Sequence, residues 1–472
     1  MTAAALAPEF TDRLHWINAP AATLAGQRGR VVAIAFWSAG SAYSHNLLGD
    51  LRHLQAKYPD RLRVFALHVP KFEAERSPAL VEQAVGRLGL AFPVANDPDF
   101  VAWQHYGIQA WPSVALVDAR GQLREIVAGD MQREALDASI AAMLDEPGVV
   151  PQAEAVVVRN AAMRTALAWP AGIAVGAKHL YIADSGHHRI LECTHDGRLL
   201  RVFGGGFPDL VDGSLDEAAF NAPRGLSLVR DTLYVADTGN HALRRISLPR
   251  GQVDTLAGNG QPGTPVEGPV ADPAAATLDQ PWAVAAAQGR LFAALAGSNQ
   301  IWEYDLGLGV LRRLCGSDQF GLTDGAADVA EFAHPASLAL VQKTLYVCDA
   351  SASALRSVNI DSGAVQTLVG RGPFEFGDQD GSREAARLQY PLAIALDPDA
   401  PVLWVADAYN DALRRLKLGG GGLSRFPCDH PLRRPAAIAV AAGALWLANT
   451  DAHEILRIQI DSGQASRLPV GE

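Results

Sequence analysis

Two serines, Ser41 and Ser44, follow closely on an apolar segment that ends in Trp37. A serine becomes a nucleophile when a neighbouring base removes its proton and a third group orients that base. His45 is adjacent in the sequence, but neither serine lies in a Gly-x-Ser-x-Gly elbow and no partner acid is evident. The residues around Ser41 therefore argue against a serine nucleophile.

A second group of potentially reactive residues recurs along the chain at regular intervals. Four aspartates close similar five-residue units, such as Leu233-Tyr-Val-Ala-Asp237; they are Asp184, Asp237, Asp349 and Asp407. Three histidines, His188, His241 and His453, fall at or next to matching positions. A catalytic or metal site needs only one copy, so this recurrence indicates architecture. We expect the aspartates to accept hydrogen bonds from turn N–H groups, and we predict no metal site and no cofactor.

The elements that position Ser41 alternate between strand-like and helix-like segments. Residues 31–36 form a continuous apolar run, which is typical of a strand buried on both faces. Residues 47–58 then place apolar side chains at helical spacing. Further strands are expected at 62–69, 113–117 and 123–127, and further helices at 77–88 and 133–144. This order predicts an α/β sheet covered by helices, with Ser41 placed to cap the first helix.

From about residue 165 the chain changes to short strands and glycine-rich turns that repeat six times. Each copy begins with a proline and contains one of the five-residue units; the prolines are Pro170, Pro223, Pro281, Pro335, Pro391 and Pro435. Six copies that can each supply four strands predict an all-β six-bladed propeller. The third copy ends its unit in Leu295 and the sixth in Asn449. Either sequence drift or a specialised binding surface explains these departures.

Both halves resemble known families. The motifs Pro170-Ala-Gly-Ile-Ala174 and Tyr234-Val-Ala-Asp-Thr-Gly-Asn-His241 resemble the NHL repeat. Residues 36–44 and 108–113 resemble the active-site turn and the cis-proline loop of a TlpA-type thioredoxin fold, with Pro112 as that proline. A thioredoxin-like domain followed by a six-bladed NHL propeller resembles the NHL-repeat-containing protein 2-like family.

The resemblance places Ser41 and Ser44 where the redox cysteines of that fold stand. A serine hydroxyl has no accessible anion near neutral pH and forms no disulfide, whereas thiol–disulfide exchange needs a thiolate. Residues 1–150 contain no cysteine at all. Dithiol oxidoreductase activity is therefore unexpected. The resemblance leaves two interpretations of the degenerate turn: a capped helix only, or a peptide- or small-ligand-binding groove formed by Trp37, Ser41, Tyr43, Ser44, Trp111 and Pro112.

These patterns divide the chain into two domains. We expect a thioredoxin-like domain over residues 1–148, a linker over 149–164 and the propeller over 165–472. Within the linker, residues 153–159 are strand-like and are expected to join a blade. Of the four cysteines, Cys193, Cys315 and Cys348 occupy apolar slots of the repeat and are expected in the core.

Composition limits the partners of the protein. The 472 residues carry a net charge of −11, which disfavours general nucleic-acid binding. No apolar run reaches the length of a transmembrane helix, and the first 20 residues lack the pattern of a secretory signal. Four cysteines are too few for a disulfide framework. We expect a cytoplasmic protein.

Two functions from different classes remain open, with a third that the serines disfavour. The first is a non-enzymatic scaffold whose propeller face and degenerate thioredoxin-like groove bind a protein or peptide. The second is a lyase- or hydrolase-type propeller enzyme that acts on a small molecule in the axial channel. The third is a thiol–disulfide oxidoreductase. Convergent carboxylates or a metal in the channel would favour the second, and an apolar channel would count against it. The sequence does not fix the oligomeric state.

Overall fold

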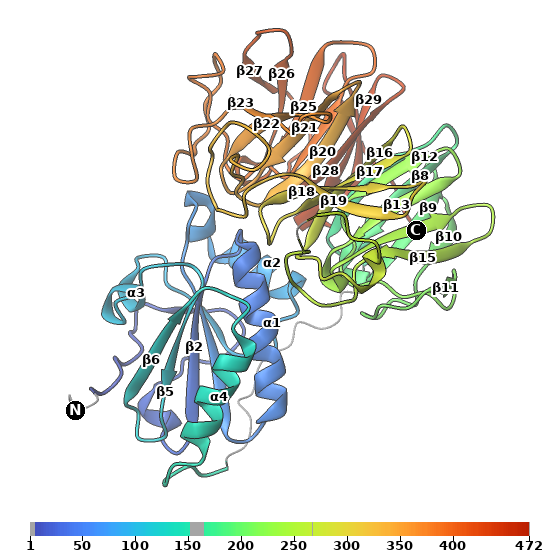
Figure 1. The fold of residues 1–472 in the computed structure, drawn as a ribbon. Coiled ribbons are helices and arrows are strands. Elements are labelled where there is room, and N and C mark those ends of the chain that lie inside the picture. The colour runs from blue at the N-terminus through green and yellow to red at the C-terminus, as the bar shows by residue number, and fades with distance from the viewer. Residues whose placement is uncertain (1–4, 152–164, 267, 472) are drawn as a thin grey trace. The chain divides into compact units, whose positions relative to one another are not determined.

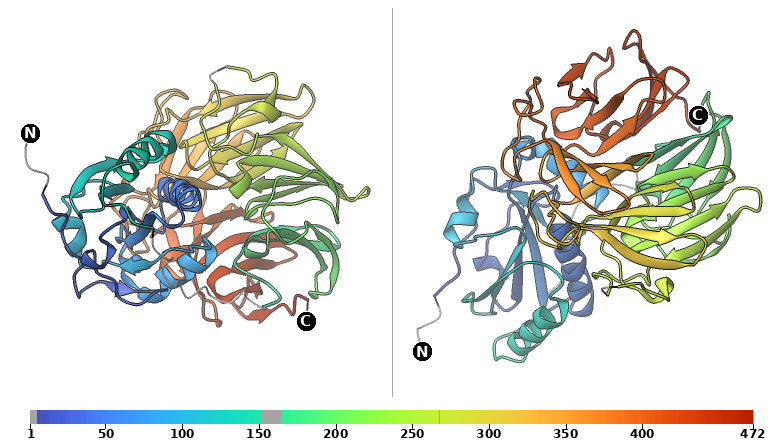
Figure 2. Two further views of the ribbon diagram at one scale, coloured as in Figure 1. Left: turned by 90° about the horizontal axis from the view of Figure 1, so that it is seen from below. Right: turned by 45° about the horizontal axis from the view of Figure 1, so that its top comes forward.

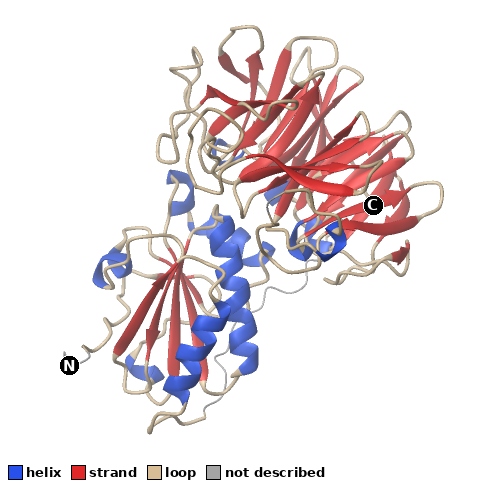
Figure 3. Ribbon diagram, viewed as in Figure 1, coloured by secondary structure: helices blue, strands red, loops and turns tan. Residues whose placement is uncertain are grey.

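The computed structural model describes residues 5–151, 165–266 and 268–471, and these divide into two compact units within Met1–Met163 and Arg164–Glu472. The first contains the long helices, whereas the second consists of strands, loops and short 3₁₀ turns (Figure 3). The strand-like linker segment predicted at 153–159 lies outside the described residues.

The first unit is an α/β fold built on a six-stranded sheet of order β1-β4-β3-β2-β5-β6. β2 runs parallel to β3, which runs parallel to β4. On the other side of β2, β5 runs antiparallel to β2, and β6 runs antiparallel to β5. The strands are β1 (His15–Trp16), β2 (Val31–Trp37), β3 (Leu62–His68), β4 (Val94–Asn96), β5 (Ser113–Val117) and β6 (Leu123–Ala128). The helices are α1 (Ala42–Lys57), α2 (Pro78–Arg87), α3 (Val101–His105) and α4 (Arg133–Leu144).

Two separate hydrophobic cores explain the composition of β2. All seven of its residues are buried, because alternate side chains pack into one core with α1 and α4 and into another with Tyr106 and Ile108. Figure 1 shows α1 and α4 side by side on one face of this sheet. The predicted strands and helices of this unit are confirmed, while β1, β4 and α3 are additional.

The second unit is the predicted six-bladed propeller. Its first three blades are β7 (Pro170–Val175), β8 (His179–Asp184), β9 (Arg189–Thr194), β10 (Leu199–Phe203); β11 (Gly213–Ser214), β12 (Leu226–Val229), β13 (Thr232–Asp237), β14 (Ala242–Ser247), β15 (Gln252–Ala257); and β16 (Pro281–Ala287), β17 (Arg290–Leu295), β18 (Gln300–Asp305), β19 (Val310–Cys315).

The remaining three blades are β20 (Pro335–Val341), β21 (Thr344–Asp349), β22 (Ala354–Asn359), β23 (Val365–Val369); β24 (Ala393–Leu396), β25 (Val402–Asp407), β26 (Ala412–Lys417), β27 (Leu423–Phe426); and β28 (Pro435–Ala441), β29 (Ala444–Asn449), β30 (Glu454–Gln459), β31 (Ala465–Arg467). Each blade is an antiparallel sheet of consecutive strands, β11 being an added edge strand. Figure 2 shows the red last blade beside the green first one, where β28 packs on β7 and closes the ring.

Candidate functional site

The turn between β2 and α1 is built by its own serines. Ser41 is the N-cap of α1, and its Oγ accepts a hydrogen bond of 3.2 Å from the Ser44 N–H. The Ser44 Oγ in turn accepts the Ser38 N–H at 3.2 Å. Both serine side chains are buried. Each hydroxyl oxygen therefore satisfies a main-chain donor of the turn.

One ring nitrogen of His45 is held by the main chain of the turn. Its Nε2 lies 3.0 Å from the carbonyl oxygen of Ala39, a contact in which the imidazole donates. A general base must instead present a free nitrogen lone pair to the nucleophile. The Nε2 nitrogen of His45 is therefore occupied by the turn and does not act as a base towards Ser41.

A buried carboxylate that the sequence did not single out holds the same turn. Glu75 lies in a short 3₁₀ turn (Glu73–Arg76), and its side chain is fully buried. It accepts hydrogen bonds from the Ser38 hydroxyl, from the Gly40 N–H at 2.7 Å and from the Lys71 N–H at 2.8 Å. These donors compensate the cost of burying the charge. Glu75 is thus a positioning residue for the start of α1.

Beside Glu75 lies a second buried polar side chain, His68 at the end of β3. Its Nδ1 lies 2.9 Å from Asn96 Oδ1, and its Nε2 lies 3.9 Å from a Glu75 oxygen. Burial lowers the pKa of His68, against the opposing effect of Glu75, so the imidazole is neutral at pH 7. Since both groups are shielded from solvent, they organise the strand ends and are not available to a substrate.

The aromatic residues expected in the groove separate into two groups. Trp37 is 0% exposed and packs edge-on against His68, so its predicted place in a groove wall is wrong. The reason is that β2 is covered on both faces. Trp111 is half-buried, and its Nε1 donates to the Val69 carbonyl at 3.0 Å. Tyr43 lies in the first turn of α1 and is also half-buried.

Two further aromatic residues join Trp111 instead. The ring centroids of Trp103 and Trp111 lie 4.4 Å apart. The Phe100 ring packs edge-on against both of them. Trp103 and Phe100 are half-buried, and we call these three residues the aromatic patch. Pro112 follows Trp111 through a cis peptide bond and is buried. Since Ser113 pairs with Phe36, the patch lies at the same end of the sheet as the Ser41 turn.

The recurrent aspartates have the expected role and a second one. Each accepts the N–H of the residue two positions before its blade's proline; the donors are Ala168, Asn221, Ala333 and Gln389, at 2.7 to 2.8 Å. The other carboxylate oxygen pairs with a buried arginine, namely Arg244, Arg356 or Arg414, and with the half-buried Arg189 in the first blade. Burial raises the pKa of Asp237 and Asp407 to about 6, so both are ionised at neutral pH.

The third blade replaces this ion pair as a unit. Leu295 stands at the aspartate position, and Trp302 stands where the arginine of three other blades lies. Both are buried, and Trp302 donates its Nε1 to Gln300 at 2.9 Å. The departure of this blade is therefore a paired substitution within the core.

The recurrent histidines lie at the seams between blades. In each blade a residue of positive φ accepts the N–H of the residue that precedes the next blade's proline; these acceptors are His188, His241, Asn299, Ser353, Asp411 and His453. His453 accepts from Trp169 and so serves the ring-closing seam. The acceptor is Nδ1 in the histidines, which requires a neutral ring. We call these contacts seam bonds.

The seam bond of His188 predicts a pH dependence of stability. Burial and the neighbouring His187 lower its pKa, against the opposing effect of Asp184. The unfolded chain therefore binds the proton more readily, so stability is full above about pH 6.5 and falls as the pH drops towards the folded-state pKa. His188→Asn copies Asn299 and keeps an uncharged acceptor. Urea unfolding at pH 7.5 and pH 5 should show a smaller loss for this variant than for the wild type; an equal loss would contradict the assignment.

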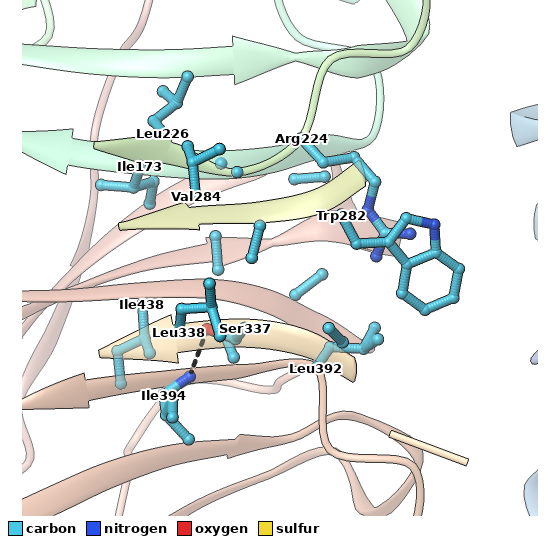
Figure 4. Close-up of a pocket in the computed structure, with 18 residues that line it drawn as sticks. Ile173, Arg224, Leu226, Trp282, Val284, Ser337, Leu338, Leu392, Ile394 and Ile438 are labelled. Atoms are coloured by element: carbon cyan, nitrogen blue, oxygen red, sulfur yellow. Dashed lines mark hydrogen bonds between the residues drawn. The ribbon is translucent and has the colours of Figure 1, made fainter. Parts of the chain in front are cut away.

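The propeller encloses a narrow axial channel. The first strands of all six blades line it, and the cavity measures about 80 Å³. Figure 4 shows its apolar side chains, among them Ile173, Leu226 and Val284, with Arg224 and Trp282 together at one end. The Arg224 guanidinium lies 4.2 Å from the Trp282 ring. Among the described residues lining the channel there is no carboxylate or imidazole.

The metal-ligating side chains, the helices and the cysteines of the described residues complete the description of potential sites. No cluster of three or more histidine, cysteine, aspartate or glutamate side chains with metal-binding geometry occurs in the residues described. None of the helices described there is long and apolar enough to cross a membrane. Cys193, Cys315 and Cys348 are buried in the propeller, where burial raises the pKa of Cys193 and Cys315 to about 12.

Comparison with known proteins agrees with both halves of the fold. Residues 167–193 match the family model of the NHL repeat. Over 141 residues the chain is 25% identical to the thiol-disulfide oxidoreductase YkuV of Bacillus subtilis (strain 168), covering 29% of this chain and 94% of that protein. The cysteine-to-serine replacement at Ser41 and Ser44 stays an inference from the resemblance of the motifs.

Two longer relatives match almost the whole chain. It is 31% identical over 500 residues to the protein SUPPRESSOR OF QUENCHING 1, chloroplastic, of Arabidopsis thaliana, covering 98% of this chain but only 47% of that protein. It thus spans about half the length of that relative. It is 30% identical over 519 residues to NHL repeat-containing protein 2 of Bos taurus, covering 98% of this chain and 72% of that protein. The chain therefore belongs to the family of NHL repeat-containing protein 2.

Proposed function

We propose that the protein is a non-redox binding protein that uses the aromatic patch of its thioredoxin-like unit, together with a face of its propeller, to hold a protein or peptide. The observation that carries the proposal is the patch of Phe100, Trp103 and Trp111. Aromatic side chains that stay half-exposed beside an ordered polar turn are typical of recognition surfaces. The site contains serines, so binding there leads to no disulfide exchange.

The rigidity of the surroundings supports a recognition role. The Trp111 indole is fixed at one edge by its bond to the Val69 carbonyl and at one face by Trp103. The adjacent turn is fixed by Ser41, Ser44 and Glu75. A surface that is ordered before binding loses little conformational entropy when a partner arrives. Among the described residues that line the propeller axis, no arrangement of groups offers a comparable case for catalysis.

Loss of Trp111 is expected to remove partners of this surface. Trp111→Ala deletes the central ring of the aromatic patch, and truncation of such an anchor typically costs about 2 kcal/mol or more of binding energy. Quantitative affinity capture, followed by titration of each recovered partner as a pure protein, should show at least a tenfold weaker Kd for the variant. Phe374→Ala is the matched control, because Phe374 is a highly exposed aromatic residue of the propeller. Equal partner sets and affinities for all three proteins would refute the patch as the binding surface.

A further inference from the structure

The three rings of the aromatic patch touch one another in a way that limits what they can bind. The ring centroids of Trp103 and Trp111 lie 4.4 Å apart, with their planes inclined by 35°. The Phe100 ring stands almost perpendicular to both, with centroid distances of 6.1 and 6.2 Å. Because each ring contacts the other two, no space for a guest remains between them. The patch is therefore a ridge of ring edges and outer faces, which excludes an aromatic cage for an alkylammonium group.

The main chain is strained where it presents the first of these rings. Phe100 precedes α3 with φ 60° and ψ 25°, in the left-handed region that bulky side chains rarely adopt. The buried Asp97 holds this turn, because its carboxylate accepts the N–H groups of Val101 at 2.9 Å and of Trp103 at 3.0 Å. A glycine would adopt the same turn without strain. Strain that is kept at a half-exposed aromatic residue is typical of ligand-binding positions.

The ridge also offers a hydrogen-bond donor to a ligand. The indole N–H of Trp111 is occupied, since it donates to the Val69 carbonyl at 3.0 Å. The Trp103 Nε1, by contrast, has no hydrogen-bond partner among the described residues and is not shut off from solvent. An accessible indole N–H donates to carbonyl oxygens. The patch therefore favours a ligand that combines apolar rings with free main-chain carbonyls.

The segment that carries two of the three rings is negatively charged. Residues 97–105 contain two acidic side chains, Asp97 and the exposed Asp99, and neither lysine nor arginine. Arg76 donates to a main-chain carbonyl of this segment at 2.7 Å, but it is itself paired with Glu73. A ligand that has a basic residue beside its apolar part is therefore complementary to this end of the ridge.

The common conformations of a bound peptide differ in how they could use this ridge. A helix bonds its own carbonyl oxygens internally, except those of its last turn. An added β-strand needs a sheet edge, whereas the ridge is made of side chains from α3 and from the loops before α3 and β5. A polyproline II chain has no internal hydrogen bonds, so all of its carbonyl oxygens are free to accept. This conformation uses both the rings and the indole donor.

We propose that the aromatic patch binds a proline-rich segment of a partner polypeptide in the polyproline II conformation, with a basic residue beside the prolines. The proline rings pack on the ridge, a ligand carbonyl accepts the Trp103 N–H, and the basic residue pairs with Asp99. A segment that is stiff before it binds loses little entropy on a rigid surface. Because this ligand class is assigned to the same patch, it rests on the proposed function.

The test is isothermal titration of the full chain with a peptide of about ten prolines that ends in an arginine. The control peptide has the same length and charge, but glycine replaces every second proline, so it has no preformed polyproline II helix. The proline peptide should bind, and the control peptide should bind at least about tenfold more weakly.

Two variants separate the contributions of the donor and of the charge. Trp103→Phe keeps an aromatic ring but removes the Nε1 donor, and it should weaken binding of the proline peptide about fivefold. Trp16→Phe is the matched control, because Trp16 is a half-buried tryptophan of the same unit that packs on Phe10 and Phe65. Asp99→Asn should weaken binding of the arginine-bearing peptide about threefold and leave that of uncharged polyproline unchanged.

The assignment of a proline-rich ligand is overturned if the proline peptide does not bind, if both peptides bind equally, or if Trp111→Ala binds the proline peptide as tightly as the wild type. These results are distinguishable from a failure of the proposed function. A Trp111→Ala variant that loses its captured partners, in a protein that ignores the proline peptide, would show that the patch binds polypeptides of another class, such as an amphipathic helix.

Discussion

Replacing Ser41 and Ser44 together by cysteine is expected to create a dithiol site and a measurable insulin-reductase activity, which the wild type is expected to lack. A cysteine at position 41 would stand at the N-cap of α1, where the Ser44 N–H now donates to the serine oxygen. That bond and the helix dipole favour a thiolate. Glu75 lies under the same turn and opposes this effect, because a buried carboxylate disfavours a second negative charge nearby.

The double variant Ser41→Cys/Ser44→Cys is measured by dithiothreitol-dependent reduction of insulin and by counting free thiols before and after oxidation. The single variants Ser41→Cys and Ser44→Cys are the matched controls, since each lacks a resolving thiol and should remain inactive. Insulin reduction by the wild type would contradict the role given to the serines. A double variant that folds but loses no thiols on oxidation would show that the turn does not have the geometry of a redox site.

The largest effect on stability is expected from Asp349→Leu in the fourth blade. This change leaves the buried Arg356 guanidinium without its buried carboxylate, and breaking such a pair costs about 3–5 kcal/mol. The double variant Asp349→Leu/Arg356→Met imitates the apolar pair of the third blade, Leu295 and Trp302. It should recover about 1–3 kcal/mol of that loss, because an apolar pair pays no desolvation penalty.

Urea unfolding of the propeller, followed by tryptophan fluorescence, measures this difference. The control is Lys343→Ala, which breaks the exposed ion pair of Lys343 with Asp361 and should leave the transition unchanged. A double variant less stable than Asp349→Leu would show that the charged pair is not exchangeable as a unit. An Asp349→Leu variant as stable as the wild type would show that Arg356 finds compensation elsewhere.

Features governed by local sequence were predictable. The helical spacing of apolar residues after Ser41 predicts both α1 and its N-cap. The cap is predictable because its hydrogen bond joins residues only three apart in the sequence. The six prolines and their five-residue units predicted the blades, because each blade is made of consecutive strands. By contrast, β4 has three residues and α3 has five, which is too short for any hydrophobic period to emerge.

Features that depend on residues distant in the chain were not predictable. Glu75 reaches the Ser38–Gly40 turn from 35 residues away, and its own neighbours, Glu73 and Arg76, are typical of a solvated turn. Trp37 was misplaced because every residue of β2 is buried, so no alternation marks which side chains face a groove. The recurrence of His188 and His241 was visible, but each one's donor belongs to the next blade.

The seam bonds carry a consequence for how this propeller changes over generations. The last seam uses the same bond as the others, with Trp169 and His453 in place of a neighbouring pair, and Thr450 donates to the Pro170 carbonyl just as Thr238 donates to Pro281. Every blade therefore supplies a seam-bond acceptor to the next blade and a seam-bond donor to the previous one. Duplication or exchange of one complete repeat preserves both of its seam bonds, so each blade can be inherited as an interchangeable module. The side chains between the seam bonds can meanwhile diverge, as they have in the third blade.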